Sequence, residues 1–531
     1  MGQPPGYGTF ADRAVVLDDP PLLLDLQGID VDGTEAQRLL PALERAFEEM
    51  RALEAGGIAN PDEGRRVGHY WLRAPDLAPD PELRQAIERT IDEVRRFAAA
   101  VHDGSIAPRP GTRFSDVLHI GIGGSALGPQ LVADALGTPD DPLGIRFLDN
   151  TDPEGIERTF SELGDRLETT LVVVVSKSGG TPETRNGMEE AIARLRARGL
   201  DPAAHLVAVT GEGSALWRRA EEQRFAGRFP MWDWVGGRTS VTSAVGLLPM
   251  ALCGHDAAAF LDGARAMDAA TRVPDPYANP AARLAVAWHV AGEGRGARDM
   301  VVIPYRDRLG LFARYLQQLV MESLGKERDR DGRIVHQGLS VYGNKGSTDQ
   351  HAYVQQLRDG LDNFFALLVG TLEDRLVGAP LEVEPGVTSG DFLAGFLLGT
   401  RRALLERGRR VITLWLPRTD ARALGALIAL FERTVGLYAS LVNVNAYHQP
   451  GVEAGKRAAA EVLSLQRALL DALSGEEGAL RTAPEWAERT GHAGLAVEAF
   501  WVLERLAADP RRPVRREGPS DPVRARYGFV S

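Results

Sequence analysis

The sequence predicts an α/β fold with two doubly wound parallel sheets, a helical N-terminal segment and a small C-terminal extension. Short apolar runs alternate with helix-like segments between residues 114 and 210, and the alternation restarts after Pro280. The run at residues 170–175 is almost wholly apolar, which is typical of a strand buried on both faces. At about 100–200 residues per domain, a chain of 531 residues has room for both sheets.

Residues 1–110 are expected to form the helical N-terminal segment. Leucine and alanine recur at helical spacing within residues 35–53 and 81–101, between polar positions. Nothing in this segment indicates chemistry, so the search for a functional site begins further along the chain.

The first α/β domain is placed at residues 111–280. An expected strand at residues 117–120 runs into the glycine-rich loop GIGGS, residues 121–125. The strand at residues 170–175 runs into SKSGGT, residues 176–181, ahead of a helix. Ligands bind at the carboxyl ends of strands in such sheets, so these two loops are candidates for a binding site.

The second α/β domain is placed at residues 281–475 and the C-terminal extension at residues 476–531. Strands are expected at residues 300–303 and 411–416, each with a helix after it. The extension has two short helices and then a Pro- and Arg-rich segment, a pattern compatible with a small winged-helix-like appendage. We expect it to pack or to stabilise a dimer, with nucleic-acid binding as the less favoured alternative.

Composition argues against several classes of protein. There are 73 acidic and 61 basic residues, a net charge of −12, so no nucleic-acid partner is expected. One cysteine, Cys253, excludes an intrachain disulfide and a multi-cysteine metal site. The uncharged stretch at residues 239–254 is too short and too polar to span a bilayer, so no membrane association is expected. No secretory signal is recognised, which makes the cytoplasm the expected compartment.

Lysine is rare in this chain. It occurs only four times among the 61 basic residues, at Lys177, Lys326, Lys345 and Lys456. A chain that otherwise uses arginine is interpreted as keeping lysine where a compact ammonium is needed. Compositional drift is the alternative, but all four lysines lie in or beside the motifs described below.

The loop at residues 176–181 suits a phosphate group. A helix N-terminus offers unpaired N–H groups and partial positive charge, and two glycines let the backbone approach an anion. Ser176, Ser178 and Thr181 add hydroxyls. The spacing is neither that of a P-loop nor that of a dinucleotide fingerprint, which favours a small phosphate monoester. For each glycine loop taken alone, an ordinary strand–helix turn is the alternative.

Four side chains with acid, base or charge-stabilising chemistry lie beside glycine-rich turns: Arg238, Glu322, His351 and Lys456. Taken singly, each could be a solvated or structural residue. Together with an anion loop they fit proton abstraction next to a carbonyl, where a carboxylate moves the proton and a guanidinium stabilises the enolate oxygen.

Six ordered motifs resemble the glucose-6-phosphate isomerase family. They are GIGGSALGP (121–129), SKSGGTPET (176–184), WVGGRTS (234–240), MESLGK (321–326), GSTDQHAYVQQLRDG (346–360) and QPGVEAGK (449–456). The resemblance covers roughly residues 110–475. It implies two sugar-isomerase (SIS) domains, a homodimer, and interconversion of glucose 6-phosphate and fructose 6-phosphate in glycolysis and gluconeogenesis, without metal or organic cofactor.

The resemblance also implies a role for each matching residue. Glu322 would move a proton between C2 and C1 through a cis-enediol, and Arg238 would stabilise the enediolate. His351, supplied by the partner subunit, would open the sugar ring with the help of Lys456. The residues implied to contact the sugar phosphate are Gly124, Ser125, Ser176, Lys177 through its backbone, Ser178, Thr181, Gln318 and Gln449.

Two alternatives differ in chemistry. A non-catalytic sugar-phosphate-binding SIS regulator would keep the fold, but it would have no reason to keep all four acid, base and charge-stabilising residues. An amidotransferase isomerase domain is disfavoured because the chain has no catalytic N-terminal cysteine. The sequence departs from the family pattern at Leu324, where an asparagine is common, and in the Gly-Gly form of its phosphate loop. These departures bear on sugar preference and leave the expected reaction unchanged.

Overall fold

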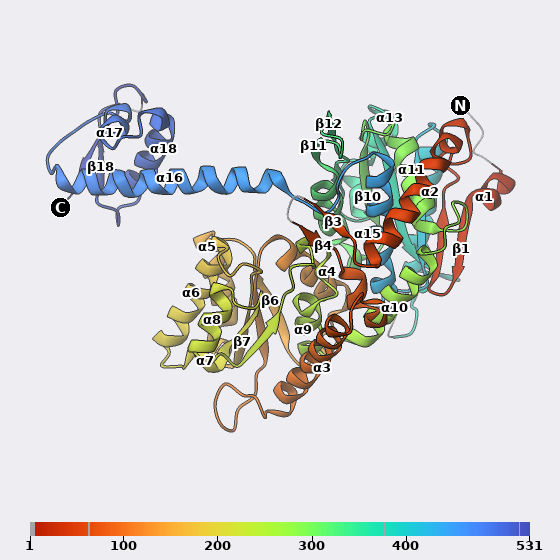
Figure 1. Ribbon diagram of the computed structural model, residues 1–531, viewed down its shortest axis with the longest axis horizontal. Coiled ribbons are helices and arrows are strands. Elements are labelled where there is room, and N and C mark those ends of the chain that lie inside the picture. The colour runs from red at the N-terminus through yellow and green to blue at the C-terminus, as the bar shows by residue number, and fades with distance from the viewer. Residues whose placement is uncertain (1–5, 62–63, 376–377, 520, 531) are drawn as a thin grey trace. The chain divides into compact units, whose positions relative to one another are not determined.

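The computed structural model describes residues 6–61, 64–375, 378–519 and 521–530. It divides into two compact units, residues 1–448 and 449–531, which are described separately. The first unit contains both large sheets (Figure 1).

The first sheet is wholly parallel, in the order β6-β5-β7-β8-β9. Its central strand β7 (Thr170–Val175) is buried at every position. Val172 and Val174 contact the apolar cluster on one face, whereas Leu171, Val173 and Val175 contact the cluster on the other, because successive side chains of a strand point to opposite faces. The other strands are β5 (Asp116–Ile120), β6 (Gly144–Leu148), β8 (Leu206–Thr210) and β9 (Gly227–Pro230).

Helices cover both faces of this sheet (Figure 1). One face carries α5 (Pro153–Leu163), α6 (Pro182–Ala197) and α8 (Ala215–Glu222), and α7 (Pro202–His205) precedes β8. The other carries α3 (Pro81–Asp103), α4 (Leu127–Leu136) and α9 (Ala244–Leu252). The predicted doubly wound sheet is therefore confirmed for this part of the chain.

The second sheet has six strands, in the order β1-β2-β17-β14-β10-β13. Four are parallel: β10 (Asp299–Pro304), β13 (Val341–Tyr342), β14 (Phe364–Thr371) and β17 (Val411–Leu416). Helices α10 (Ala257–Thr271), α11 (Pro280–Gly292), α12 (Phe312–Leu316) and α15 (Ala421–Leu441) contribute to the core on one face, and α13 (Val354–Asp359) and α14 (Ser389–Leu405) to that on the other. Two small hairpins, β11–β12 (Lys326–Arg328, Ile334–Gln337) and β15–β16 (Glu382–Glu384, Val387–Thr388), lie in the connections.

The two sheets share one strand order. Numbered along the chain, the parallel strands of the first sheet run 2-1-3-4-5, and those of the second run 2-1-3-4. In both sheets the order reverses between the first strand and the third, β5 and β7 in one and β10 and β14 in the other. Such a switch point is where open α/β sheets bind ligands.

The N-terminal segment corrects one expectation. It contains α1 (Tyr7–Arg13), α2 (Thr34–Glu54), α3 and the short pair β3–β4 (Ile58–Asn60, Arg65–Arg66), but residues 14–25 are not helical. They form the hairpin β1 (Ala14–Asp18) and β2 (Pro21–Asp25), and β2 pairs antiparallel with β17. The pairing buries Leu22 and Leu24 in the core. Because β17 lies almost 400 residues further on, the local pattern could not reveal this partner.

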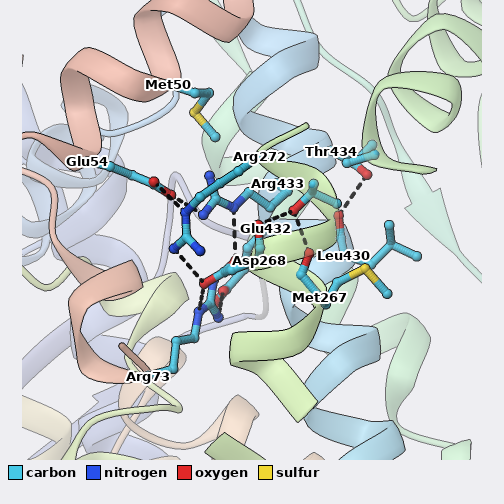
Figure 2. Close-up of polar contacts among 12 residues, drawn as sticks. Met50, Glu54, Arg73, Met267, Asp268, Arg272, Leu430, Glu432, Arg433 and Thr434 are labelled. Carbon is cyan, nitrogen blue, oxygen red and sulfur yellow. Dashed lines mark hydrogen bonds and ion pairs between the residues drawn. The ribbon is translucent and has the colours of Figure 1, made fainter. Parts of the chain in front are cut away.

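Helix α15 carries buried charges in an apolar setting. It is long and apolar enough to cross a membrane by length and composition, yet 89% of the relevant window is buried inside the protein. Its Arg433 donates to Asp268 at 2.9 Å, and Arg73 donates to Asp268 at 2.6 Å and to Glu432 (Figure 2). Glu54 of α2 completes the cluster by pairing with Arg433. Buried charges are tolerable when paired in this way, and these pairs join α2, α10 and α15.

The second unit begins at Gln449. It comprises α16 (Pro450–Gly475), α17 (Ala483–Arg489), α18 (Ala496–Ala508) and the antiparallel hairpin β18–β19 (Val514–Glu517, Arg526–Phe529). Helix α16 belongs with the extension because Leu465, Leu469 and Leu473 pack in one core with Trp486 and Tyr527. The sequence placed residues 449–475 in the second α/β domain instead. The winged-helix-like character of residues 476–531 and the domain boundary at residue 280 stay predictions.

Candidate active site

The expected phosphate loop follows β7 and opens α6. Ser176 is buried and donates from Oγ to Thr181 Oγ1 at 3.1 Å, and Gly180 N donates to Ser178 Oγ at 3.2 Å. Gly179 has φ +69°, and a Cβ there would lie 2.5 Å from Leu216 N, so a glycine is needed. The loop brings the three predicted hydroxyls to a helix N-terminus, where anions are stabilised.

Lys177 joins this loop to the segment that carries Arg238. Its Nζ donates to the carbonyl oxygens of Asp233 at 2.8 Å and of Val235 at 3.0 Å. An ammonium has three donors on a flexible stem, so it can serve two converging carbonyls at once. The predicted contact of the Lys177 backbone with phosphate stays a prediction.

The loop after β5 lies against the same segment. A Cβ on Gly124 would lie 2.1 Å from Gly237 O, so only glycine allows the two backbones to approach so closely. Ser240 Oγ donates to Gly124 O at 3.0 Å. Ser125 lies at the end of the short helix η3 (Gly123–Ser125), and its carbonyl contacts a ring nitrogen of His119 at 2.7 Å. Gly124 and Ser125 are thereby fixed beside Arg238.

Arg238 and Glu322, which are 84 positions apart in the sequence, form a hydrogen-bonded ion pair. Arg238 lies in the turn η5 (Gly237–Thr239) and is 8% exposed. Glu322 ends a π-helical turn, η7 (Gln317–Glu322). Arg238 Nε donates to Glu322 Oε2 at 3.3 Å. π-Helical turns are rare and occur frequently at functional sites, and this one carries both Gln318 and Glu322.

Gln318 faces the loop after β5. A Cβ on Gly123 would lie 3.2 Å from Gln318 Nε2, so the amide reaches this loop. A cavity of about 220 Å³ lies here, and Gly123, Gln318, Asp149 and Arg314 are among its lining residues. Arg314 donates to Asp149 at 3.1 Å. Sequence reasoning missed Asp149 and Arg314, because neither lies in a glycine-rich motif.

Lys326 closes the helical segment that carries Glu322. Its Nζ donates to the carbonyl oxygens of Glu322 and Ser323, both at 2.8 Å. Burial, with a contribution from Arg238, lowers the pKa of Lys326 to about 8. The sequence indicated Lys326 only through the rarity of lysine, and the structure shows that it holds the backbone of Glu322.

Arg238 also donates to the carbonyl of Ala446. This bond connects it to the last residues of the first unit. The sequence could not predict this hydrogen bond, because every residue has a backbone carbonyl.

His351 lies in the turn η8 (Thr348–His351) and is exposed. Its neighbour Asp349 is buried, accepts from Asn344 N at 3.1 Å and accepts from the Tyr353 hydroxyl. Among the described residues, no hydrogen bond or ion pair joins His351 to Glu322 or Arg238. The predicted role of His351 stays a prediction.

Gln449 and Lys456 belong to the second unit. Gln449 precedes α16, and Lys456 lies in its second turn, but the side chain of Lys456 is outside the described part of the chain. Their predicted roles stay predictions. No group of three or more His, Cys, Asp or Glu side chains that could hold a metal ion occurs among the described residues.

Comparison with known proteins identifies the family. A family model described as phosphoglucose isomerase matches residues 30–365 and 403–471. Glucose-6-phosphate isomerase of Synechococcus sp. is 56% identical, with 94% of each chain covered, and that of Geobacter sulfurreducens is 57% identical, with 96% of each covered. The crystal structure of a glucose-6-phosphate isomerase from Chlamydia trachomatis superposes with a TM-score of 0.79 at 26% identity, covering 87% of this chain and 92% of that one. The chain therefore belongs to the phosphoglucose isomerase family.

Proposed function

We propose that the chain is a glucose-6-phosphate isomerase, which interconverts glucose 6-phosphate and fructose 6-phosphate. The observation that carries the proposal is the Arg238–Glu322 pair, 3.3 Å apart between Nε and Oε2. Lys177 of the phosphate loop is hydrogen-bonded to the segment that carries Arg238. The identity of more than half with curated isomerases, over nearly the whole chain, favours catalysis over a non-catalytic regulator.

The phosphate loop orients the sugar phosphate. The hydroxyls of Ser176, Ser178 and Thr181, the backbone of Lys177 and the N-terminus of α6 hold the phosphate. Gly124 and Ser125 bring a second backbone segment close to the sugar phosphate, and Gln318 lies on the side of Glu322. Binding energy gained at the phosphate thereby fixes the reacting carbons relative to the base.

Glu322 moves a proton between C2 and C1 of the open-chain sugar. Removal of the proton from one carbon leaves negative charge on the adjacent oxygen, and the Arg238 guanidinium stabilises this enediolate. Return of the proton to the other carbon, together with transfer of the hydroxyl proton from one oxygen to the other, completes the isomerisation. No electron donor or acceptor is needed, since the reaction only relocates hydrogen within one molecule.

Ring opening is assigned to His351 and Lys456, with His351 supplied across a homodimer. The exposure of His351 and the lack of a bond to the Arg238–Glu322 pair within the described residues support this assignment. Gln449 is assigned to substrate contact. These roles follow from the positions of the matching motifs.

Two further expectations are proposed with the function. We place the protein in the cytoplasm, where its sugar phosphates are metabolised. We assign no nucleic-acid role to the C-terminal extension, because many of its arginines are paired with its own carboxylates. Examples are Arg511 with Asp509 at 2.9 Å and Arg516 with Glu504.

The test is a coupled assay of the purified full chain with fructose 6-phosphate, in the presence of a chelator. We expect glucose 6-phosphate to be formed at a rate proportional to enzyme concentration. Binding of the sugar phosphate without turnover would favour the regulator, and turnover only after addition of a metal ion would contradict the proposed chemistry.

A further inference from the structure

A second cavity opens at the carboxyl edge of the second sheet, apart from the Arg238–Glu322 pair. Its volume is about 680 Å³. Each of three parallel strands contributes residues from the loop that follows it or from its end. These residues are Arg306 and Asp307 after β10, Thr371 and Glu373 at the end of β14, and Arg418 and Thr419 after β17.

The position of this cavity repeats that of the phosphate loop. The two sheets share the strand order 2-1-3-4, so β14 corresponds to β7 and β10 to β5. In the first sheet, the loops after β5 and β7 form the proposed sugar-phosphate site. In the second, the loops after β10 and β14 line the cavity, so it lies at the equivalent switch point.

The cavity has a surplus of positive charge. Among the described residues that line it, five are basic and three are acidic. Arg306 is largely buried and donates to the carbonyl oxygens of Glu373 and Asp374, while the Asp374 carboxylate is 3.8 Å away. Burial lowers the pKa of the Arg306 guanidinium, and Asp374 opposes this only in part. An anion in the cavity would compensate the buried charge.

A buried hydroxyl beside the cavity lacks a partner among the described residues. Thr419 is 6% exposed, lines the cavity, and its Oγ1 has no hydrogen-bond partner among the described residues. A buried polar group without a partner is costly, so an acceptor or donor from a ligand would be stabilising. Thr419 immediately precedes Asp420, the N-cap of α15, and Ser389 at the start of α14 also lines the cavity. Two long helices thus begin at the cavity, and helix N-termini favour anions.

One side of the cavity is apolar. Leu393 and Phe396 of α14 contribute this wall. Inorganic phosphate needs no apolar contact, whereas the carbon skeleton of a phosphate ester would cover such a wall.

We propose that this cavity is a second anion site, which binds a small phosphate ester between Arg306, Arg418 and Thr419. Neither Arg238 nor Glu322 lines this cavity, and the proposal does not depend on the reaction proposed above. Its basis is the repeated switch point, the surplus of basic side chains and the unpartnered Thr419 hydroxyl.

The test uses inorganic phosphate as the probe and a full-length protein with the phosphate loop disabled by Ser178→Ala and Thr181→Ala. Isothermal titration calorimetry is expected to detect phosphate binding in this background. Adding Thr419→Val should weaken it at least about tenfold, as expected when a hydrogen bond to a charged ligand is lost. Arg418→Gln is a second variant with the same expected direction.

Thr413→Val is the matched control. Thr413 lies on β17, is also buried, and its hydroxyl also lacks a partner among the described residues, but it does not line the cavity. Thr413→Val should leave phosphate binding unchanged. Equal phosphate affinity of the Thr419→Val and Thr413→Val proteins would overturn the proposal, as would the absence of phosphate binding in the background.

Thermal unfolding in phosphate-free buffer separates a ligand role from a structural one. Both valine variants remove a buried hydroxyl without a partner, so both should be at least as stable as the background. A melting temperature lowered by Thr419→Val alone would mean that this hydroxyl stabilises the fold, and would contradict the proposal.

Discussion

Arg238 Nε lies 3.3 Å from Glu322 Oε2, although 84 residues of sequence separate the two. In the proposed function, this pair places a base and a fixed positive charge on the same side of the proposed sugar-phosphate site. Isomerisation needs both at once, because negative charge builds on oxygen as the proton leaves carbon. A lysine fixes the backbone of the segment that carries each residue. Lys177 donates to a backbone carbonyl of the Arg238 segment, and Lys326 donates to the backbone carbonyl of Glu322.

Glu322→Gln is expected to slow isomerisation strongly while preserving the fold. Glutamine keeps the shape and can still contact Arg238, but it cannot accept the proton. We expect a fall in kcat on the order of 10²–10⁴. Exchange of the C2 hydrogen with solvent, followed by NMR, measures the step directly. Exchange at the wild-type rate in this variant would remove Glu322 from its proposed role.

Lys177→Met is expected to impair catalysis, although the Lys177 ammonium donates to two backbone carbonyls and is assigned no contact with the substrate. Loss of these bonds frees the Arg238 segment from the phosphate loop, and a misplacement of about 1 Å can cost on the order of 10²-fold in rate. Steady-state kinetics should show a lower kcat and a higher KM for fructose 6-phosphate.

Lys345→Met is the control for this variant. Lys345 pairs with Asp307 at 2.8 Å at the rim of the second cavity, where both side chains are exposed and neither belongs to the proposed sugar-phosphate site. An exposed pair contributes about 0–1 kcal/mol, so its loss should change stability and kinetics little. Equal losses of activity in the two methionine variants would show that the Lys177 contacts have no special role.

Lys326 should make stability depend on pH in the alkaline range. Its pKa falls from 10.5 to about 8 in the native state. Below pH 8 both native and unfolded chains carry the charge, so its burial cost is fully present. Between about pH 8 and 10.5 the native lysine is neutral while the unfolded one stays charged, so the unfolded state binds more protons and stability rises with pH.

Lys326→Met isolates this contribution. The shift corresponds to about 3 kcal/mol at about 1.36 kcal/mol per pKa unit. Urea unfolding of both proteins from pH 7 to 10 should show the wild type gaining about 2–3 kcal/mol relative to the variant. Parallel stability curves for the two proteins would mean that Lys326 is not desolvated in the native state.

Local sequence patterns predicted the parallel sheets, because a buried strand or a glycine-rich loop can be recognised from a short stretch of sequence. The resemblance to the isomerase family, which those loops carried, is confirmed by the family match. The hairpin β1–β2 was missed because its partner β17 is remote in sequence. The contact of Arg238 with the carbonyl of Ala446 was missed because carbonyls leave no sequence signal.

The four lysines show how much the composition of the chain can predict about the roles of individual residues. Their rarity marked Lys177 and Lys326, and in the structure each donates to two backbone carbonyls. A compact ammonium suits two converging acceptors, whereas a planar guanidinium needs more room. Lys345 instead forms an exposed ion pair, so rarity alone does not distinguish a structural lysine from a surface one.

The proposed shared site can be tested by mixing two inactive proteins. In a homodimer whose His351 serves the partner's Glu322, His351→Ala and Glu322→Gln each inactivate both sites. Unfolding and refolding the two variants together, in equal amounts, should produce mixed dimers in which one site has both wild-type residues. About a quarter of all sites would then be intact, for random pairing of a two-fold dimer.

Size-exclusion chromatography with light scattering should give a dimer mass for each variant and for the mixture. Coupled assays with fructose 6-phosphate should recover about a quarter of wild-type activity only after joint refolding. Variants refolded separately and then combined on ice provide the control, because their subunits have not exchanged. Failure to recover activity from confirmed mixed dimers would mean that Glu322 and His351 act within one chain, and the proposed contribution of the partner subunit would be wrong.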